Sequence, residues 1–557
     1  MNMSMNRSQG IETTKTKAQL VADSIIIFSI VLFTLWQGSY FPLQFFLLIA
    51  LLFVALLVFG KTLVITKEAL LLLGITFLYS LSLVFLSENH YIGLVETLRT
   101  LVFPLSLILF LARRNINLEK PFLVTFVIIA IIGFFEVASI IIMPAGMDEG
   151  VGRLHSVLQY ANATALLMLI GMLYTIGRFA AHKKIPNLLY FAIFSAALFL
   201  TGSRTTLVIA LAVCTLHVFL LVSRKYKIIV LAVFSLAVVI VVCLGLFTEI
   251  RIFRLSIVTS TLVERFITFQ DAFYMLRDRW YLGIGSGNWQ HWQFRYQSAP
   301  YFVRFIHNYY LQLFLDGGIL APIFFCLAMF PAMFKGIRKK SVHGLILLAF
   351  VLHATLDIAP LFPAISIAAM YSLSKLCEKE FQLNLGKLRY AAIAPAIVLT
   401  VLWSSEFLSA QAVGHLNRGD LDSSMRYSKA AHALNPLNSD LYMHMSRSTG
   451  DNITLREEYV RRAVRANAND LRAISALVQF ETRRGNYETA LEFSSKLIEG
   501  RRFSVPYQNL HRETAGRAFG VGLITAERYY AILAEIDDIS TQINPLFTRY
   551  HRTEIPD

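Results

Sequence analysis

The sequence predicts an all-α, polytopic membrane protein with a helical domain outside the membrane at its C-terminal end. Three observations support this fold class. The 557 residues are 56% hydrophobic and only 16% charged, which is outside the usual range of soluble globular proteins. Apolar runs long enough to cross a bilayer recur as far as residue 405. After Phe407 the composition becomes polar and typical of soluble helices.

About thirteen apolar runs are predicted to span the membrane, because a span needs about 20 apolar residues and slightly shorter runs are tolerated. They are residues 22–37, 42–60, 69–86, 99–112, 121–143, 161–177, 187–202, 205–222, 228–247, 308–334, 342–359, 361–376 and 389–405. The sequence therefore divides into a cytoplasmic segment 1–21, a transmembrane core 22–405 with an external loop 248–307, and an external domain 406–557.

Lysine predicts the orientation. Cytoplasmic loops are enriched in Lys and Arg. With the N-terminus in the cytoplasm, fifteen of the seventeen lysines fall on the inner side and none falls in an outer loop. The other two, Lys429 and Lys496, belong to the C-terminal domain. The net charge of +15 does not predict a nucleic-acid partner, because most lysines lie in short segments between apolar runs, where they set the topology. The four cysteines form no CxxC pair, so neither a disulfide framework nor a zinc site is predicted.

The outer surface is nevertheless basic, and arginine supplies that charge. A guanidinium is permanently charged and grips phosphate oxygens through two parallel hydrogen bonds, so this set suits a diphosphate at the membrane surface. The alternative is that the arginines pair with nearby carboxylates or contact lipid headgroups. The predicted outer arginines are Arg99, Arg153, Arg204, Arg251, Arg254, Arg265, Arg277, Arg279, Arg295 and Arg304.

Four stretches carry the most specific signal. They are GRLHSVLQYANATA (152–165), TGSRTTL (201–207), ERFITFQDAFYMLRDRWYLGIGSGNW (264–289) and IHNYYLQLFLDGGILAP (306–322). Their order resembles the O-antigen ligase and polymerase superfamily, which includes bacterial O-linked oligosaccharyltransferases. The resemblance implies a multispanning core of the C-type glycosyltransferase kind with a large external loop before a late span.

The resemblance also implies an activity. The enzyme would transfer a glycan from a polyprenyl (undecaprenyl) diphosphate donor to an acceptor hydroxyl. The reaction would be inverting and take place at the outer face of the bacterial cytoplasmic membrane. The acceptor would be a glycolipid, a glycan or a protein. The external histidine of the family matches His307, and its arginines match Arg204 and, by weaker matches, Arg153, Arg265 and Arg277.

The residue chemistry agrees with such a site. A neutral imidazole suits a general base at neutral pH, so His307 is predicted to take the proton of the acceptor hydroxyl. We therefore assign catalysis to His307, Arg204 and Arg265. Diphosphate binding is assigned to Arg153, Arg204, Arg265 and Arg277. Asn308 and Asp357 are predicted to position the substrate, Asp357 together with His353 one helical turn away.

Neither a metal nor another cofactor is expected, because arginines offset the charge of a departing diphosphate. Glu136 is a polar residue that the prediction puts in the middle of the fifth span. The tryptophans and tyrosines of the long loop, among them Trp280, Trp289 and Trp292, have two interpretations. They form either an interfacial belt or platforms for sugar rings.

The C-terminal region contains a degenerate repeat. The turn RGD at 418–420 recurs as RGN at 484–486, with Gly450, Asp451 and Asn452 between them. This spacing is close to a helical repeat of about 34 residues and resembles tetratricopeptide repeats. Such a solenoid binds an extended partner, here acceptor protein or glycan, or simply caps the bundle.

Three functional hypotheses remain open from the sequence. The first is a ligase or oligosaccharyltransferase that moves a preassembled lipid-linked glycan. The second is a polymerase that extends lipid-linked repeat units. The third, from another class, is a lipid or polysaccharide transporter, which would be expected to show paired repeats and charges near mid-membrane. The polar residues at the outer end of the spans favour the enzymes.

Overall fold

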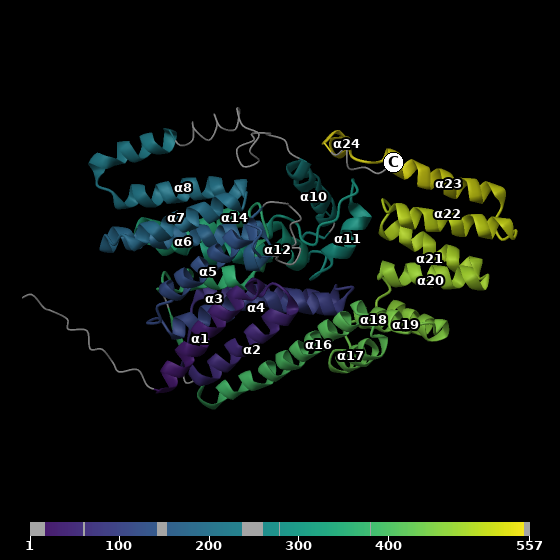
Figure 1. Ribbon diagram of the computed structural model, residues 1–557, viewed down its shortest axis with the longest axis horizontal. Helices are drawn as coiled ribbons and strands as arrows, with labels where there is room; N and C mark the ends of the chain where they lie inside the picture. The colour runs from purple at the N-terminus through teal and green to yellow at the C-terminus, as the bar shows by residue number, and fades with distance from the viewer. Residues whose placement is uncertain are drawn as a thin grey trace, which may run out of the picture.

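The structure is a computed structural model that describes residues 17–59, 62–141, 153–236, 260–277, 279–378 and 380–550. The chain is 78% helical, and the described residues contain one two-stranded sheet, so the fold is all-α. A helical bundle occupies one side of the molecule and a curved row of C-terminal helices the other, with α10, α11 and α12 between them (Figure 1).

The bundle is made of apolar helices. They are α1 (Lys17–Leu35), α2 (Pro42–Phe59), α3 (Lys67–Phe85), α4 (His90–Ala112), α5 (Glu119–Val137), α6 (Ala161–His182), α7 (Pro186–Leu200), α8 (Arg204–Leu221), α13 (Leu320–Arg338), α14 (Val342–Ala354), α15 (Pro363–Ser374) and α16 (Ile393–Asn417). Short 3-10 segments join several of them: η1 (Gln37–Ser39), η2 (Ser156–Leu158), η3 (Arg224–Tyr226), η4 (Ala359–Leu361) and η5 (Gly386–Ala392).

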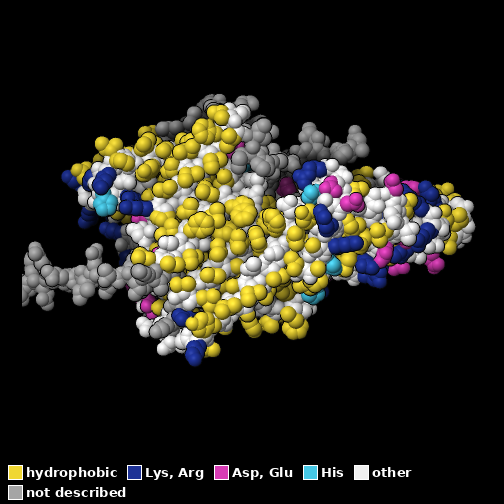
Figure 2. Space-filling view, turned by 60° about the horizontal axis from the view of Figure 1, so that its bottom comes forward, with side chains coloured by type: hydrophobic (Ala, Val, Ile, Leu, Met, Phe, Trp, Pro, Cys, Tyr) yellow, Lys and Arg dark blue, Asp and Glu magenta, His cyan; other side chains and the backbone are white. Residues whose placement is uncertain are grey.

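Within the described residues, seven helices are long and apolar enough to cross a membrane, and five shorter helices are also apolar. Hydrophobic side chains cover the surface of the bundle, whereas charged side chains gather over the C-terminal helices (Figure 2). The chain is therefore an integral membrane protein. The number of thirteen spans stays a prediction, and the second half of the predicted span 228–247 lies outside the described residues.

Three predictions about the spans are corrected. The predicted span 308–334 is two helices, α12 (Tyr309–Gly317) and α13, because the chain turns at Gly318. The fifth span ends earlier than predicted, so Glu136 lies in the last turn of α5 and not in its middle. Arg99 does not lie at a span end. It is buried within α4, which begins at His90, and its Nε donates to Glu96 at 3.0 Å.

The connections that carry lysines lie at one end of the bundle. The strands β1 (Thr62–Ile65) and β2 (Phe381–Asn384), from two predicted inner loops, pair antiparallel. Nearby, Lys335 and Lys339 both contact Glu378, at 2.5 and 2.6 Å. Because α4 and α13 each run the length of the bundle, their other ends lie at the opposite side. That opposite side carries α10 (Ser260–Leu276), α11 (Trp289–Tyr296) and α12 (Figure 1).

The C-terminal helices follow one another as neighbours. They are α17 (Leu421–Leu434), α18 (Asp440–Arg447), α19 (Ile453–Ala466), α20 (Leu471–Arg484), α21 (Tyr487–Gly500), α22 (Val505–Gly520), α23 (Ala526–Thr541) and α24 (Pro545–Tyr550). Each of the predicted turns at 418–420, 450–452 and 484–486 separates two helices. Side chains of Asp420, Asn452 and Asp470 cap the helices that follow them, which satisfies backbone N–H groups there. Tetratricopeptide identity stays a prediction.

Candidate active site

The long loop reaches the bundle through a glycine-rich stretch, GIGSG at 283–287. The Ile284 N–H donates to the Leu315 carbonyl at 2.7 Å, and the Gly287 N–H donates to Asp316 Oδ1 at 3.2 Å. A Cβ atom on Gly283 would lie 2.3 Å from the Leu315 oxygen, so only glycine fits. This contact holds the loop against the C-terminal end of α12.

The N-terminal end of α12 carries His307 and Asn308. Asn308 is the N-cap: its Oδ1 accepts a hydrogen bond from the Leu311 N–H at 3.0 Å. Directly before His307, the Ile306 N–H donates to Gln312 Oε1 at 3.1 Å. Bonds on both sides of His307 therefore fix its backbone. Asn308 acts as a helix cap, and its predicted role towards substrate stays a prediction.

Asp357 is the centre of the polar cluster at this end of the bundle. It lies after α14 and is only 2% exposed. Its Oδ2 accepts hydrogen bonds from the Tyr160 hydroxyl at 2.9 Å and from Asn162 Nδ2 at 2.7 Å. Arg265, from α10, brings Nη2 within 3.6 Å of the same oxygen. His353 and His307 lie close enough to this carboxylate to interact with it electrostatically.

Arg153 joins the cluster from the segment before α6. Its Nη2 donates to Asn162 Oδ1 at 3.3 Å, and its Nε donates to the Thr201 carbonyl at 2.8 Å. Asn162 thus bridges Arg153 and Asp357. Two guanidinium groups, those of Arg153 and Arg265, are therefore linked through Asn162 and Asp357.

The start of α8 completes the cluster. Arg204 is the first residue of this helix and follows the N-cap Ser203. Thr206 Oγ1 lies 2.9 Å from Ser203 Oγ and 3.0 Å from His353 Nε2. The segment that carries Arg204 is therefore fixed by α14 through His353 and by Arg153 through Thr201.

The structure brings together most of the predicted site residues. His307, Arg265, Arg153 and Asp357 belong to one cluster, Asn308 adjoins it, and Arg204 begins the helix that borders it. Arg277 does not join them. It lies twelve positions after Arg265, just beyond the end of α10, which is roughly 18 Å at 1.5 Å per residue, and its side chain is exposed.

Sequence reasoning missed three members of the cluster, Tyr160, Asn162 and Thr206. All three fall within the quoted stretches 152–165 and 201–207, but a neutral side chain between apolar residues gave no separate signal. Glu136 has a structural role near them. Its carboxylate accepts from the Ser156 N–H at 2.7 Å and lies 3.0 Å from His155 Nδ1, which anchors the segment before α6.

The loop tryptophans do not behave alike. Trp289 and Trp292 are buried, and their indole N–H groups donate to the Val303 carbonyl and to Glu88 Oε1. These two rings are therefore core residues of the loop and not a belt or a platform. Trp280 is more than half exposed, so either interpretation still applies to it.

Comparison with known families agrees with this arrangement. Residues 189–326 match the family model described as O-antigen ligase. This segment belongs to the O-antigen ligase superfamily. The match runs from α7 through the long loop and α12 into α13, so it includes Arg204, Arg265 and His307. Membership supports a membrane glycosyltransferase of the O-antigen ligase or polymerase type. No curated protein matches the chain.

Proposed function

We propose that this protein transfers a preassembled glycan from a polyprenyl diphosphate donor to an acceptor hydroxyl, as an O-antigen ligase or O-oligosaccharyltransferase. The proposed location is the outer face of a bacterial cytoplasmic membrane, with the C-terminal helices on that side. The observation that carries the proposal is the cluster around Asp357, which is joined to Arg265 directly and to Arg153 through Asn162, near His307 at one end of an apolar bundle.

The cluster has the groups that a single displacement needs. Arg153, Arg204 and Arg265 bind the diphosphate and offset the charge that grows as the bond from the anomeric carbon to its oxygen breaks. His307 takes the proton from the acceptor hydroxyl, whose oxygen forms the new bond to that carbon. One displacement from the opposite face inverts the anomeric configuration. Asp357 acts as a positioning residue by holding Arg265, Asn162 and Tyr160.

The test replaces His307 by Ala and measures glycan transfer in cells that lack the native gene. We expect transfer to fall by at least about 100-fold, because a positioned base contributes roughly 10²–10⁴-fold. His182→Ala is the matched control, since His182 is exposed at the other end of α6. Full activity of His307→Ala, at normal protein level, would remove the base role.

The same cells separate ligase from polymerase. Without a ligase, long glycan stays on its lipid carrier and unmodified acceptor accumulates. Without a polymerase, only single repeat units are found on the lipid or on the acceptor. Accumulation of long lipid-linked glycan is the outcome that we expect, and single units would assign the protein to the polymerases.

Metal independence belongs to this proposal as well. Guanidinium groups provide the positive charge at the diphosphate, so purified protein with lipid-linked donor should keep its transfer rate in the presence of EDTA. The rate is measured before and after chelation, with added Mg²⁺ as the comparison. Loss of activity that Mg²⁺ restores would contradict this part of the mechanism.

A further inference from the structure

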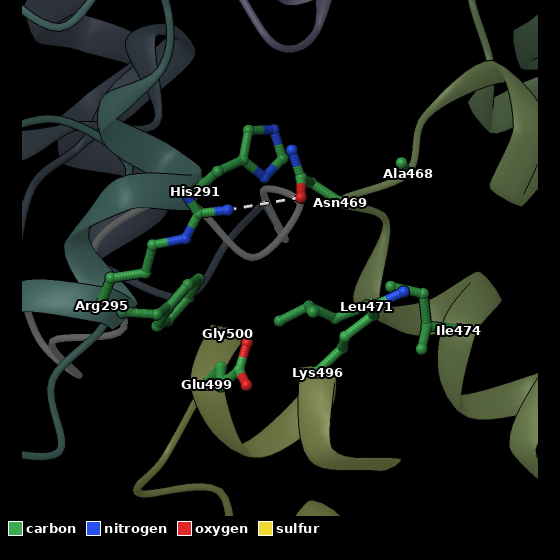
Figure 3. A pocket seen from close by; sticks show the side chains of 10 residues that line it. His291, Arg295, Ala468, Asn469, Leu471, Ile474, Lys496, Glu499 and Gly500 are labelled. Atoms are coloured by element: carbon green, nitrogen blue, oxygen red, sulfur yellow. Dashed lines mark hydrogen bonds between the residues drawn. The ribbon is translucent and has the colours of Figure 1, made fainter. Parts of the chain in front are cut away.

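A cavity lies away from the Asp357 cluster, between α11 and the C-terminal helices. Its volume is about 380 Å³, which falls within the range of small-molecule sites. His291 and Arg295 line it from α11, and Lys496 and Glu499 line it from α21 (Figure 3). Asn469, in the connection between α19 and α20, closes one side.

Hydrogen bonds hold the walls of this cavity together. Glu88, in the connection from α3 to α4, accepts from Trp292 Nε1 at 3.0 Å and from Asn469 Nδ2 at 2.6 Å. Arg295 Nη1 lies 3.3 Å from Glu88, and Arg295 Nη2 donates to Asn469 Oδ1 at 3.3 Å (Figure 3). The bundle, the loop and the C-terminal helices thus meet at one carboxylate, and the cavity is a built feature of the fold.

The charges around the cavity are largely matched. Arg295 pairs with Glu88, and Lys496 Nζ contacts Glu492 Oε1 at 2.9 Å. Burial lowers the pKa of His291, and neighbouring carboxylates do not reverse that direction, so the imidazole is neutral at neutral pH. This balance does not favour an anion.

Lys496 and Glu499 bring a hydrogen-bond donor and an acceptor to the cavity. The Glu499 side chain is exposed and lies at the cavity (Figure 3), and no hydrogen bond or ion pair engages its carboxylate within the part of the chain that the structure describes. Phe294, Leu471 and Ile474 add an apolar wall. Hydrogen-bond donors and acceptors beside an apolar wall match the hydroxyl groups and the C–H face of a sugar ring.

We propose that this cavity binds a neutral saccharide unit, a hexose or an N-acetylhexosamine, of the glycan that the protein handles. Glu499 accepts hydrogen bonds from sugar hydroxyls, while Lys496 donates to ring or hydroxyl oxygens. His291 lines the opposite wall. The choice of a glycan as ligand rests on the proposed function. The site would hold sugars outside the reaction cluster, beside the loop that leads to His307.

The experiment measures direct binding to the full chain in detergent by saturation-transfer NMR. The probes are free glucose, galactose and N-acetylglucosamine, with glucuronate as the charged comparison. We expect at least one neutral sugar to bind and to bind about tenfold more weakly to Glu499→Ala, because a hydrogen bond to a charged group is lost. Glu488→Ala, an exposed change on the same helix, is the control and should bind like the wild type.

Failure of this inference can be told apart from failure of the proposed function. His307→Ala should keep sugar binding, since His307 does not line the cavity. The His291→Leu variant tests the opposite wall and should also weaken binding. The inference is overturned if no neutral sugar binds, if glucuronate alone binds, or if both cavity variants bind sugar like the wild type. Binding of peptides in place of sugars would overturn it too.

Discussion

At the level of single residues, the contacts of Asp357 show what a carboxylate does among the arginines of the proposed anion site. A buried guanidinium without a partner is costly, and Asp357 provides one for Arg265 while also accepting from Tyr160 and Asn162. Asn162 in turn orients Arg153. One carboxylate therefore orients two cations, and a diphosphate bound as we propose would meet groups already in place.

Replacing Asp357 by Asn tests this positioning role. The change keeps the shape but removes the charge that holds Arg265, and we expect glycan transfer to fall about tenfold or more, given roughly 1.5–3 kcal/mol for a hydrogen bond to a charged group. A weakened donor site should raise KM for the lipid-linked donor more than KM for the acceptor. Transfer is assayed on purified protein over a range of both substrates.

The control for that variant is Glu378→Gln, which removes an ion-paired carboxylate at the lysine-bearing end of the bundle. It should leave both KM values unchanged. Equal KM values in Asp357→Asn and wild type would show that Asp357 does not position the donor.

For single residues, the sequence predicts well which charged side chains belong to the Asp357 cluster and predicts poorly which neutral ones do. Arg265, His307 and Asp357 stand out because charge or imidazole is rare beside apolar runs. Tyr160 and Asn162 do not stand out, because a tyrosine or asparagine at a span end has many ordinary explanations. Arg277 has the right chemistry but lies three helical turns from Arg265, a separation that only a helix register reveals.

Among the elements, the break between α12 and α13 matters most for the site. Gly318 adopts φ +73° and ψ −179°, a conformation that is essentially confined to glycine. A Cβ there would lie 2.1 Å from the Tyr281 carbonyl oxygen. The turn allows the Ile319 N–H to donate to the Trp280 carbonyl at 3.1 Å, which fastens the loop to the bundle.

Gly318→Ala should therefore loosen the loop that carries His307. The backbone conformation alone costs roughly 1–3 kcal/mol for a residue with a side chain, and the clash with Tyr281 adds to it. We expect a lower Tm and a strong loss of transfer, measured on purified protein. Gly520→Ala is the control, since a Cβ at that position meets nothing within 4 Å. An unchanged Tm for Gly318→Ala would contradict the docking role of this turn.

Hydropathy could not have found this break. Residues 308–334 are almost continuously apolar, and the average over a window hides Asp316. In the structure Asp316 accepts from Gln312 one helical turn away and from two groups distant in sequence, the Tyr79 hydroxyl and the Gly287 N–H, so tertiary contacts satisfy this buried carboxylate. Apart from 228–247 and 308–334, each predicted run coincides with a helix. Hydropathy finds these helices because the apolar residues of each one are consecutive in the sequence.

On the scale of the whole molecule, the C-terminal helices support the loop from the far side. Arg502 Nη2 donates to the Gln297 carbonyl at 2.6 Å, and the Asn544 N–H donates to the Ser298 carbonyl at 2.8 Å. Phe547 of α24 is buried in the same apolar cluster as Ile267 of α10. The C-terminal region therefore stabilises the loop, whatever partner it also binds.

The sidedness of the molecule gives the last prediction. The lysine-bearing connections gather at one end of the bundle and the Asp357 cluster at the other, so the two ends should face opposite sides of the membrane. Single cysteines at Arg304 and Lys387, both exposed, report on the two ends in a chain whose four native cysteines are replaced by serine.

A membrane-impermeant maleimide added to intact cells with a permeabilised outer layer should label Arg304→Cys but not Lys387→Cys. Labelling at Lys387 should appear only after the cytoplasmic membrane is opened. This result is expected because loops rich in Lys and Arg stay in the cytoplasm. It would place the arginines of the Asp357 cluster on the outer side, where the proposed lipid-linked glycan is presented. Labelling in the reverse pattern would put His307 in the cytoplasm and contradict transfer at the outer face, even if every contact around Asp357 were correct.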